Sequence, residues 1–275
     1  MRLSTLFVSS VLAVAAFALP SSKERFAARM ARRANGTSHL QAVAFDPSTA
    51  PRSKYSSRPK ITSANHTSFS SNWAGAVLNE GPGTWFTVQG TWEVPSPGPG
   101  PFNANFGAAS SWVGIDGDTC GNAILQTGVD MIYDNGKASF QAWYEWFPAF
   151  AQDFSLLVGP GDHVTAIVEA TSPTTGTAIL INNSSGEEVS VQLSSASALC
   201  QQDAEWIVED YQENGSMVPL ANFGTVTFFS ATAETVSGEL FGTASANIFD
   251  IEQGGSVLTD SQVGVSLVTI SPTFA

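Results

Sequence analysis

The sequence predicts an all-β protein, built as an antiparallel sandwich or a barrel. After residue 70, almost no segment repeats its apolar residues with the period of about 3.6 that a helix requires. Short runs of alternating apolar and polar residues recur instead, and Gly, Pro, Asn, Asp and Ser separate them. Residues 71–275 are long enough for one domain, and many short strands joined by such turns are typical of sandwiches and barrels.

Each alternating run predicts a strand with two different faces. The runs with this pattern are residues 84–95, 139–147, 164–170, 204–211 and 263–267. The run at 139–147 would carry on one face Phe140, Ala142, Tyr144 and Trp146, and on the other Gln141, Trp143, Glu145 and Phe147. The run at 204–211 would place on one face Glu205, Ile207, Glu209 and Tyr211.

Residues 110–130 predict a strand, a turn and a second strand. Trp112 lies in a short apolar run, and Asp116-Gly117-Asp118 is a turn-forming sequence. Residues 123–128 then read as a strand in which Gln126 has apolar neighbours. A buried glutamine needs hydrogen-bond partners, which either the fold or a substrate must supply.

Charge is distributed unevenly along the chain. Ten of the 11 Lys and Arg residues precede position 61, whereas 22 of the 24 Asp and Glu residues follow it. Nucleic acid is disfavoured as a partner, because its binding requires basic faces. Below the carboxyl pKa values of about 4, the acidic part would keep little charge to repel itself. We therefore expect its stability to be greatest in acid, although an ordinary acidic secreted protein is the simpler alternative.

The first residues predict export from the cell. Residues 1–18 have the features of a secretory signal peptide, namely Arg2, an apolar run, and the small residues Ala16 and Ala18. The apolar run is too short to span a membrane, and no later segment is apolar enough to do so. We therefore expect a secreted, monomeric protein with no membrane partner.

Residues 19–65 form a basic segment that ends in a stretch rich in Ser, Pro and Thr. We interpret it as a propeptide and linker that precede a folded domain at residues 66–275. Its positive charge would cover the acidic domain at neutral pH and release it when the carboxylates become protonated. A disordered basic tail is the alternative.

The chain contains two cysteines, Cys120 and Cys200. In an oxidising compartment such a pair suits one disulfide, and a catalytic thiol has no histidine at a convincing position. Sequons for N-glycosylation occur at Asn35, Asn65, Asn182, Asn183 and Asn214.

Several kinds of catalytic site are excluded by composition. His163 is the single histidine after residue 70, which argues against most histidine-based zinc sites and against a Ser-His-Asp triad. The sequence has no Asp-Thr-Gly or Asp-Ser-Gly, no phosphate-binding loop and no dinucleotide fingerprint. We expect neither a metal nor a cofactor, so carboxylates, amides and aromatic side chains remain for catalysis.

Four segments together resemble the glutamic peptidases, the eqolisin family of fungal acid proteases. They are residues 71–75 (SNWAG), 112–126 (WVGIDGDTCGNAILQ), 143–148 (WYEWFP) and 204–210 (AEWIVED). The resemblance implies two antiparallel sheets packed as a bent, lectin-like (concanavalin A-like) sandwich. It also implies a polypeptide substrate, a basic inhibitory propeptide and a disulfide between the two cysteines.

The same resemblance assigns roles to particular residues. It implies that Gln126 and Glu209 form the catalytic pair, and that residues 145–154 form a mobile lid. The residues that it implies for substrate binding are Trp73, Trp112, Phe147 and Tyr211, to which Glu145 is added as a neighbour on the same predicted strand face.

The chemistry of a Glu/Gln pair suits acid. Ionised Glu209 can accept a proton from water as the water attacks a peptide carbonyl, and the Gln126 amide can donate to the developing oxyanion. An amide does not titrate, so this donor persists at low pH. Two alternatives share the predicted architecture: a glycoside hydrolase that uses Glu145 and Glu209 as paired carboxylates, and a lectin without catalytic activity.

Overall fold

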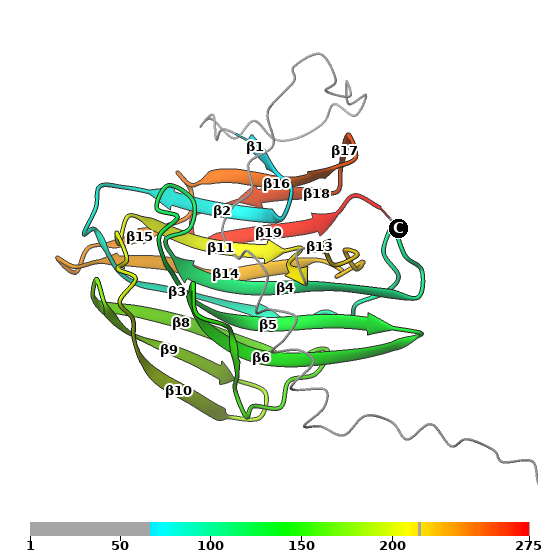
Figure 1. Cartoon of the computed structure of the whole chain (residues 1–275), viewed down its shortest axis with the longest axis horizontal. Coiled ribbons are helices and arrows are strands. Elements are labelled where there is room, and N and C mark those ends of the chain that lie inside the picture. Colours follow the sequence, from blue (N-terminus) through cyan, green and yellow to red (C-terminus); the bar gives the residue numbers. More distant parts are fainter. Residues whose placement is uncertain (1–66, 214–215, 275) are drawn as a thin grey trace, which may run out of the picture.

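The structure is a computed structural model that describes residues 67–213 and 216–274. The expected signal peptide and propeptide lie outside the described residues. The prediction of an all-β fold is confirmed, because the described residues form strands, turns and loops without a helix. Two sheets pack face to face as a sandwich rather than closing into a barrel (Figure 1).

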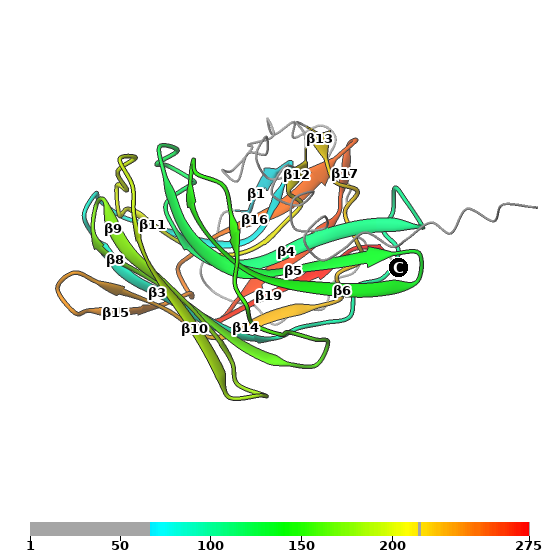
Figure 2. The same cartoon turned by 60° about the horizontal axis from the view of Figure 1, so that its bottom comes forward.

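Sheet A has nine strands in the order β1-β16-β2-β11-β4-β5-β6-β7, with β17 paired to β16. Its strands are β1 (Thr67–Ser70), β2 (Trp73–Asn79), β4 (Phe106–Ile115), β5 (Ile124–Asp134), β6 (Lys137–Phe147), β7 (Gln152–Asp153), β11 (Asp203–Glu209), β16 (Asn247–Gln253) and β17 (Ser256–Val257). The pairs are antiparallel except β1 with β16, which is parallel. Figure 2 shows the long strands of this sheet curving along their length.

Sheet B has eight strands in the order β10-β9-β8-β3-β14-β19-β18, with β15 paired to β14. Its strands are β3 (Trp85–Glu93), β8 (His163–Ser172), β9 (Thr175–Asn182), β10 (Glu187–Ser194), β14 (Val226–Thr235), β15 (Leu240–Gly242), β18 (Thr259–Val263) and β19 (Leu267–Pro272). β12 (Gln212–Glu213) and β13 (Ser216–Met217) pair antiparallel as a separate two-stranded sheet.

The main core lies between the two sheets. From sheet A it takes residues such as Val113, Leu125 and Trp206, and from sheet B residues such as Val88 and Phe228. The indole nitrogen of Trp206 also donates to the Gln89 carbonyl oxygen of sheet B at 2.7 Å. The predicted alternation of Trp206 with its strand neighbours is therefore confirmed.

The predicted strand at residues 263–267 is wrong. This run crosses the turn between β18 and β19, and the Gly264 N–H donates to the Leu267 carbonyl within it. Val265 is 80% exposed at the turn. Three alternating residues are too few to distinguish a strand from a tight turn with apolar residues on either side.

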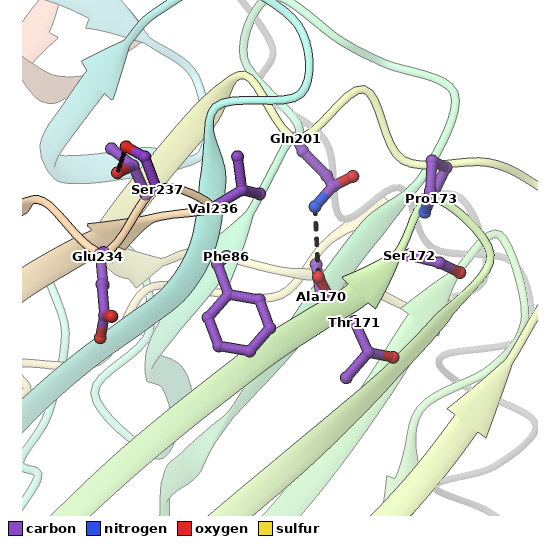
Figure 3. A pocket seen from close by; sticks show the side chains of 11 residues that line it. Phe86, Ala170, Thr171, Ser172, Pro173, Gln201, Glu234, Val236 and Ser237 are labelled. Carbon is purple, nitrogen blue, oxygen red and sulfur yellow. Dashed lines mark hydrogen bonds between the residues drawn. The ribbon is translucent and has the colours of Figure 1, made fainter.

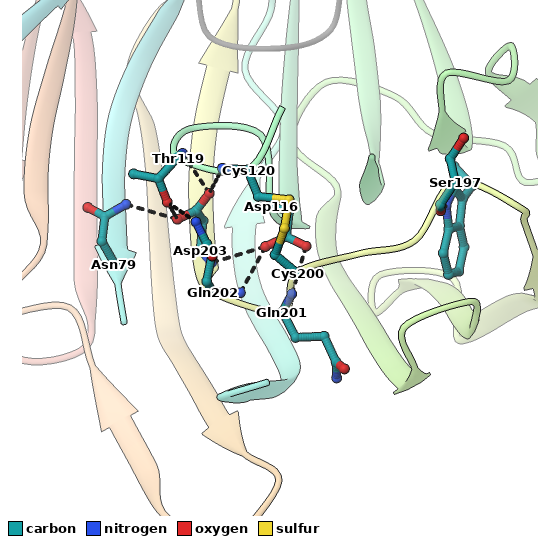
Figure 4. The surroundings of a disulfide bond; sticks show 10 residues. Asn79, Asp116, Thr119, Cys120, Ser197, Cys200, Gln201, Gln202 and Asp203 are labelled. Atoms are coloured by element: carbon teal, nitrogen blue, oxygen red, sulfur yellow. Dashed lines mark hydrogen bonds between the residues drawn. A yellow bond between two sulfur atoms is a disulfide. The ribbon is translucent and has the colours of Figure 1, made fainter. Parts of the chain in front are cut away.

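The disulfide between Cys120 and Cys200 joins the loop after β4 to the segment before β11 (Figure 4). Two carboxylates reinforce this junction from opposite sides. Asp116 accepts backbone N–H groups from residues 201–203, and Asp203 accepts those of Thr119 and Cys120. The junction holds the loop at the end of β4 against the start of β11.

Replacing both cysteines with serine should lower the free energy of unfolding by about 4 kcal/mol, because the bond closes a loop of 80 residues in the unfolded chain. For a domain of this size, that loss corresponds to a melting temperature about 10 °C lower. Thermal melts of both proteins in acid would measure it, and equal melting temperatures would contradict it.

Candidate active site

The strand register places Gln126 and Glu209 on the same face of sheet A. Gln126 on β5 lies opposite Gly114 on β4, and Glu209 on β11 lies opposite Ser110 on β4. Directly opposed residues share a face, and so do residues two or four apart along one strand. Because Ser110 and Gly114 are four apart, both side chains project from one face. We call the face that carries Ser110, Trp112 and Gly114 the site face; it points away from sheet B, whereas Val113 points into the main core.

Aromatic side chains cover the middle of the site face. A second apolar cluster contains Trp73, Trp112, Trp143, Ile124, Ile207, Val77, Ala151, Phe249 and the partly buried Phe147. Within it, Trp73 and Trp112 meet edge to face, with ring centroids 4.9 Å apart. These contacts fix the indole of Trp112 and bring three of the predicted aromatic residues together.

Tyr211 lies apart from these aromatic residues. It is buried in a third cluster with Ala108 and Val218, against which Phe106 and Ile132 also pack. Ala108 is two residues before Ser110 on β4, so this cluster covers the site face at the end that is distant from Gln126. The structure therefore does not join Tyr211 to the cluster of Trp73 and Trp112.

Glu209 is the last residue of β11 and is 2% exposed. The Trp112 indole Nε1 donates to Glu209 Oε2 at 3.1 Å. Such a bond favours the ionised form of a carboxyl and orients it on the site face. Trp112 therefore connects the aromatic cluster to the predicted base.

Replacing Trp112 with Phe would keep the ring and remove this donor. Because a hydrogen bond to a charged group contributes about 1.5–3 kcal/mol, the acid limb of the pH–rate profile should move to higher pH by about one unit. Values of kcat/KM measured across the acidic range would show the shift. An acid limb at the wild-type position would contradict this role for Trp112.

Gln126 is fully buried on β5. Its amide Nε2 donates to Glu145 Oε2 on the neighbouring strand β6 at 2.5 Å. Its carbonyl Oε1 accepts no hydrogen bond within the described part of the chain. Glu145, itself 4% exposed, thus contacts the predicted oxyanion donor directly.

Next to Glu209, the site face carries a chain of hydrogen bonds that sequence reasoning missed. Trp143 Nε1 donates to Ser110 Oγ at 3.0 Å, and Ser110 Oγ donates to Asp130 Oδ1 at 2.7 Å. Ser110 lies directly opposite both Glu209 and Asp130. Alternation along β5 places Asp130 on the face of Gln126, but only the pairing of β4 with both neighbours shows that Ser110 lies between two carboxyl groups.

Four buried carboxyl groups on sheet A or its loops have raised pKa values. Burial raises the pKa of Asp116 to about 6, that of Asp250 to about 7 and that of Asp210 to about 8. Burial and three neighbouring carboxyl groups raise the pKa of Glu205 well above its usual range. Asp210 directly follows Glu209 and accepts a hydrogen bond from Gln253 Nε2 at 2.7 Å. These groups are therefore neutral in acid.

Two other features of the described residues lie away from this face. An open cavity of about 650 Å³ is lined by Phe86, Thr171, Glu234, Val236 and neighbours on sheet B (Figure 3). The one group of His, Cys, Asp and Glu side chains spaced like metal ligands contains Asp116 and the two disulfide-bonded cysteines, which have no thiolate to offer. Within residues 67–213 and 216–274, no helix could cross a membrane.

Comparisons with known proteins show the family of the chain. The sequence profile of the peptidase A4 family matches residues 71–272, which include all four motif segments. The chain belongs to the peptidase A4 family. It is 41% identical to Aspergillopepsin-2 of Aspergillus niger over 98% of this chain and 99% of that protein. It is also 37% identical to Scytalidopepsin B of Scytalidium lignicola, with the same two shares covered.

A solved structure of a glutamic peptidase has a similar fold. This peptidase superposes on the crystal structure of scytalido-glutamic peptidase with a peptide-based transition state analog. The TM-score is 0.66 and the identity 38%, over 74% of this chain and 98% of that chain. Membership of a family of glutamic peptidases leaves the glycoside hydrolase and lectin alternatives without support.

Proposed function

We propose that this peptidase is a secreted acid endopeptidase in which Glu209 is the general base and Gln126 the oxyanion donor. The observation that carries the proposal is the register of sheet A, which projects both side chains from one face with Trp112 bonded to the carboxyl. Family membership supports a polypeptide substrate.

The proposed reaction balances with these two groups and one water. Glu209 takes a proton from water while the water oxygen bonds to the carbonyl carbon of the substrate. The carbonyl oxygen becomes an oxyanion and accepts a hydrogen bond from Gln126 Nε2. The protonated Glu209 then gives its proton to the amide nitrogen as the C–N bond breaks. An amine and a carboxylic acid leave, and Glu209 is again ionised.

Substrate contacts are proposed for the residues around this pair. Trp73, Trp112 and Phe147 offer apolar surface in one cluster, which suits apolar side chains of a peptide. The segment that follows β6, at residues 148–151, turns back to β7, and its Ala151 packs onto that cluster. A lid at residues 145–154 would therefore close over the aromatic residues. Tyr211 would reach only a more distant part of an extended substrate.

We also propose that the protein is exported and then processed. We assign residues 1–18 to a signal peptide, residues 19–65 to an inhibitory basic propeptide and residues 66–275 to the monomeric peptidase domain. Of the sequons in the described residues, Asn183 is exposed, whereas Asn182 is buried and its Nδ2 donates to Leu157 and Asp162. Any glycan on this hairpin would therefore be carried by Asn183.

The test is digestion of a denatured protein at about pH 3, below the usual carboxyl pKa values. Parallel reactions would contain pepstatin, to inhibit aspartic peptidases, or EDTA, to remove metal ions. Cleavage should continue in both. Absence of cleavage by the mature enzyme, or its loss with either inhibitor, would overturn the proposal.

A further inference from the structure

One row of residues crosses four strands of sheet A through the proposed oxyanion donor. Glu205 on β11 lies opposite Gly114 on β4, Gly114 lies opposite Gln126 on β5, and Gln126 lies opposite Glu145 on β6. Because directly opposed residues share a face, the two glutamates flank the amide within the site face. Glu145 accepts a hydrogen bond from the nitrogen end of the amide. Glu205 takes no part in the proposed reaction.

Glu205 leans across the glycine toward Gln126. A Cβ atom built on Gly114 would lie 3.2 Å from Glu205 Oε2 and 2.8 Å from the Trp112 ring atom Cζ3. The glycine therefore leaves room for the carboxyl to extend over β4, and the indole ring closes the space beside it. A larger residue at this position would displace both.

Glu205 and Gln126 each have a buried polar group that lacks a hydrogen-bond partner. Glu205 is fully buried, and neither of its carboxyl oxygens has a hydrogen-bond partner of good geometry in the described chain. The Asp118 backbone N–H interacts with the carboxyl and offsets part of the rise in its pKa. Gln126 Oε1 is also buried and without a partner. A neutral carboxyl has one O–H to donate, and an amide oxygen can accept it. Unsatisfied buried polar groups are costly, so such a bond would satisfy both.

Burial favours the neutral form of Glu205, which this donation requires. Its burial is the main cause of its raised pKa, and Asp203, Asp118 and Asp116 raise it further because they are acidic groups facing it from β11 and the loop after β4. The raised pKa agrees with the geometry, because it favours the protonated carboxyl that has an O–H to donate.

We propose that Glu205 is a positioning residue, whose carboxylic O–H holds the carbonyl end of Gln126 while Glu145 holds the nitrogen end. The two ends of an amide are nearly equal in size, so packing alone does not prevent the amide from flipping. In the flipped orientation, an oxygen would face the oxyanion and repel it. A donor at one end and an acceptor at the other specify the orientation in which Nε2 faces the substrate. This inference rests on the proposed function of Gln126.

The test compares Glu205→Leu, which removes the donor, with Glu205→Gln, which keeps an N–H donor and cannot ionise. Glu205→Leu should lower kcat by about tenfold or more, up to the 10²–10³ cost of losing an oxyanion donor, with KM changed by less than about threefold. Glu205→Gln should restore most of kcat. The matched control is Asp250→Leu, at a buried acid on β16, which should lower the melting temperature without lowering kcat.

A double-mutant cycle separates this role from a purely structural one. If Glu205 acts through the amide, Glu205→Leu should cause little further loss in a Gln126→Ala background. A loss of equal size in both backgrounds, or a folded Glu205→Leu variant with wild-type kcat, would overturn the inference. If Gln126→Ala itself keeps full activity, the proposed function fails instead, so the two failures are distinguishable.

Discussion

Glu209→Gln should abolish measurable peptide hydrolysis. The amide cannot accept a proton from water, and general acid–base groups contribute about 10²–10⁴ in rate. The substituted side chain keeps an oxygen for the Trp112 indole, so the fold should survive the change. Values of kcat/KM on a fluorogenic peptide in acid, with thermal melts of each variant, would measure both properties.

Gln126→Ala should lower kcat by about 10²–10³-fold, the usual effect of losing one oxyanion donor. Gln126→Glu should be no better, because a carboxyl in place of the amide would face the developing negative charge. Gln201→Ala is the matched control: a buried glutamine before β11, whose amide bonds to the Trp85 and Ala170 carbonyls of sheet B. A Gln126→Ala enzyme as active as Gln201→Ala would contradict the assignment.

The faces of individual strands could be predicted from the sequence because alternation is local. Residues 204–211 were expected to place Glu205, Ile207 and Glu209 together, and the pairing of β11 confirms that arrangement. The same reasoning separated Trp146, which lies in the main core, from Trp143, which lies in the cluster of the site face.

The neighbours of each face could not be predicted, because pairing joins strands that are distant in sequence. β11 lies between β2 and β4, and nothing in residues 204–211 specifies this position. The row from Glu205 through Gln126 to Glu145, the bond between Ser110 and Asp130, and the parallel pairing of β1 with β16 all depend on such contacts. Tyr211 shows the same limit, because its predicted face does not reveal that it packs with Ala108 and Val218 rather than beside Trp73 and Trp112.

Raising the pH from about 4 to about 8 should progressively destabilise the folded domain. Asp116, Asp250 and Asp210 have folded pKa values of about 6, 7 and 8, against 3.8 for the unfolded groups. Between the two values the folded state holds protons that the unfolded state has lost, so stability falls as pH rises. Within that window, each pH unit lowers the free energy of unfolding by about 1.4 kcal/mol per group. The total free energy of unfolding of a typical domain is only about 5–15 kcal/mol.

Asp210→Asn should remove the largest of these three contributions. The variant cannot ionise and keeps an oxygen for the Gln253 amide, so its melting temperature near neutral pH should exceed that of the wild type by about 10 °C. Near pH 4 the two proteins should melt alike. Asp134→Asn, at an exposed carboxyl on β5, is the matched control and should leave the whole curve unchanged.

Salt separates this explanation from simple repulsion among the many acidic residues of the domain. Repulsion between exposed carboxylates is screened strongly at about 1 M salt, where the Debye length is about 3 Å. The cost of ionising a buried carboxyl comes from lost hydration, which salt does not restore. The decline of melting temperature with pH should therefore persist in high salt for the wild type and be smaller for Asp210→Asn. A wild-type melting temperature that peaks near pH 7, or a decline that vanishes in salt, would show that buried carboxyl groups do not control the stability.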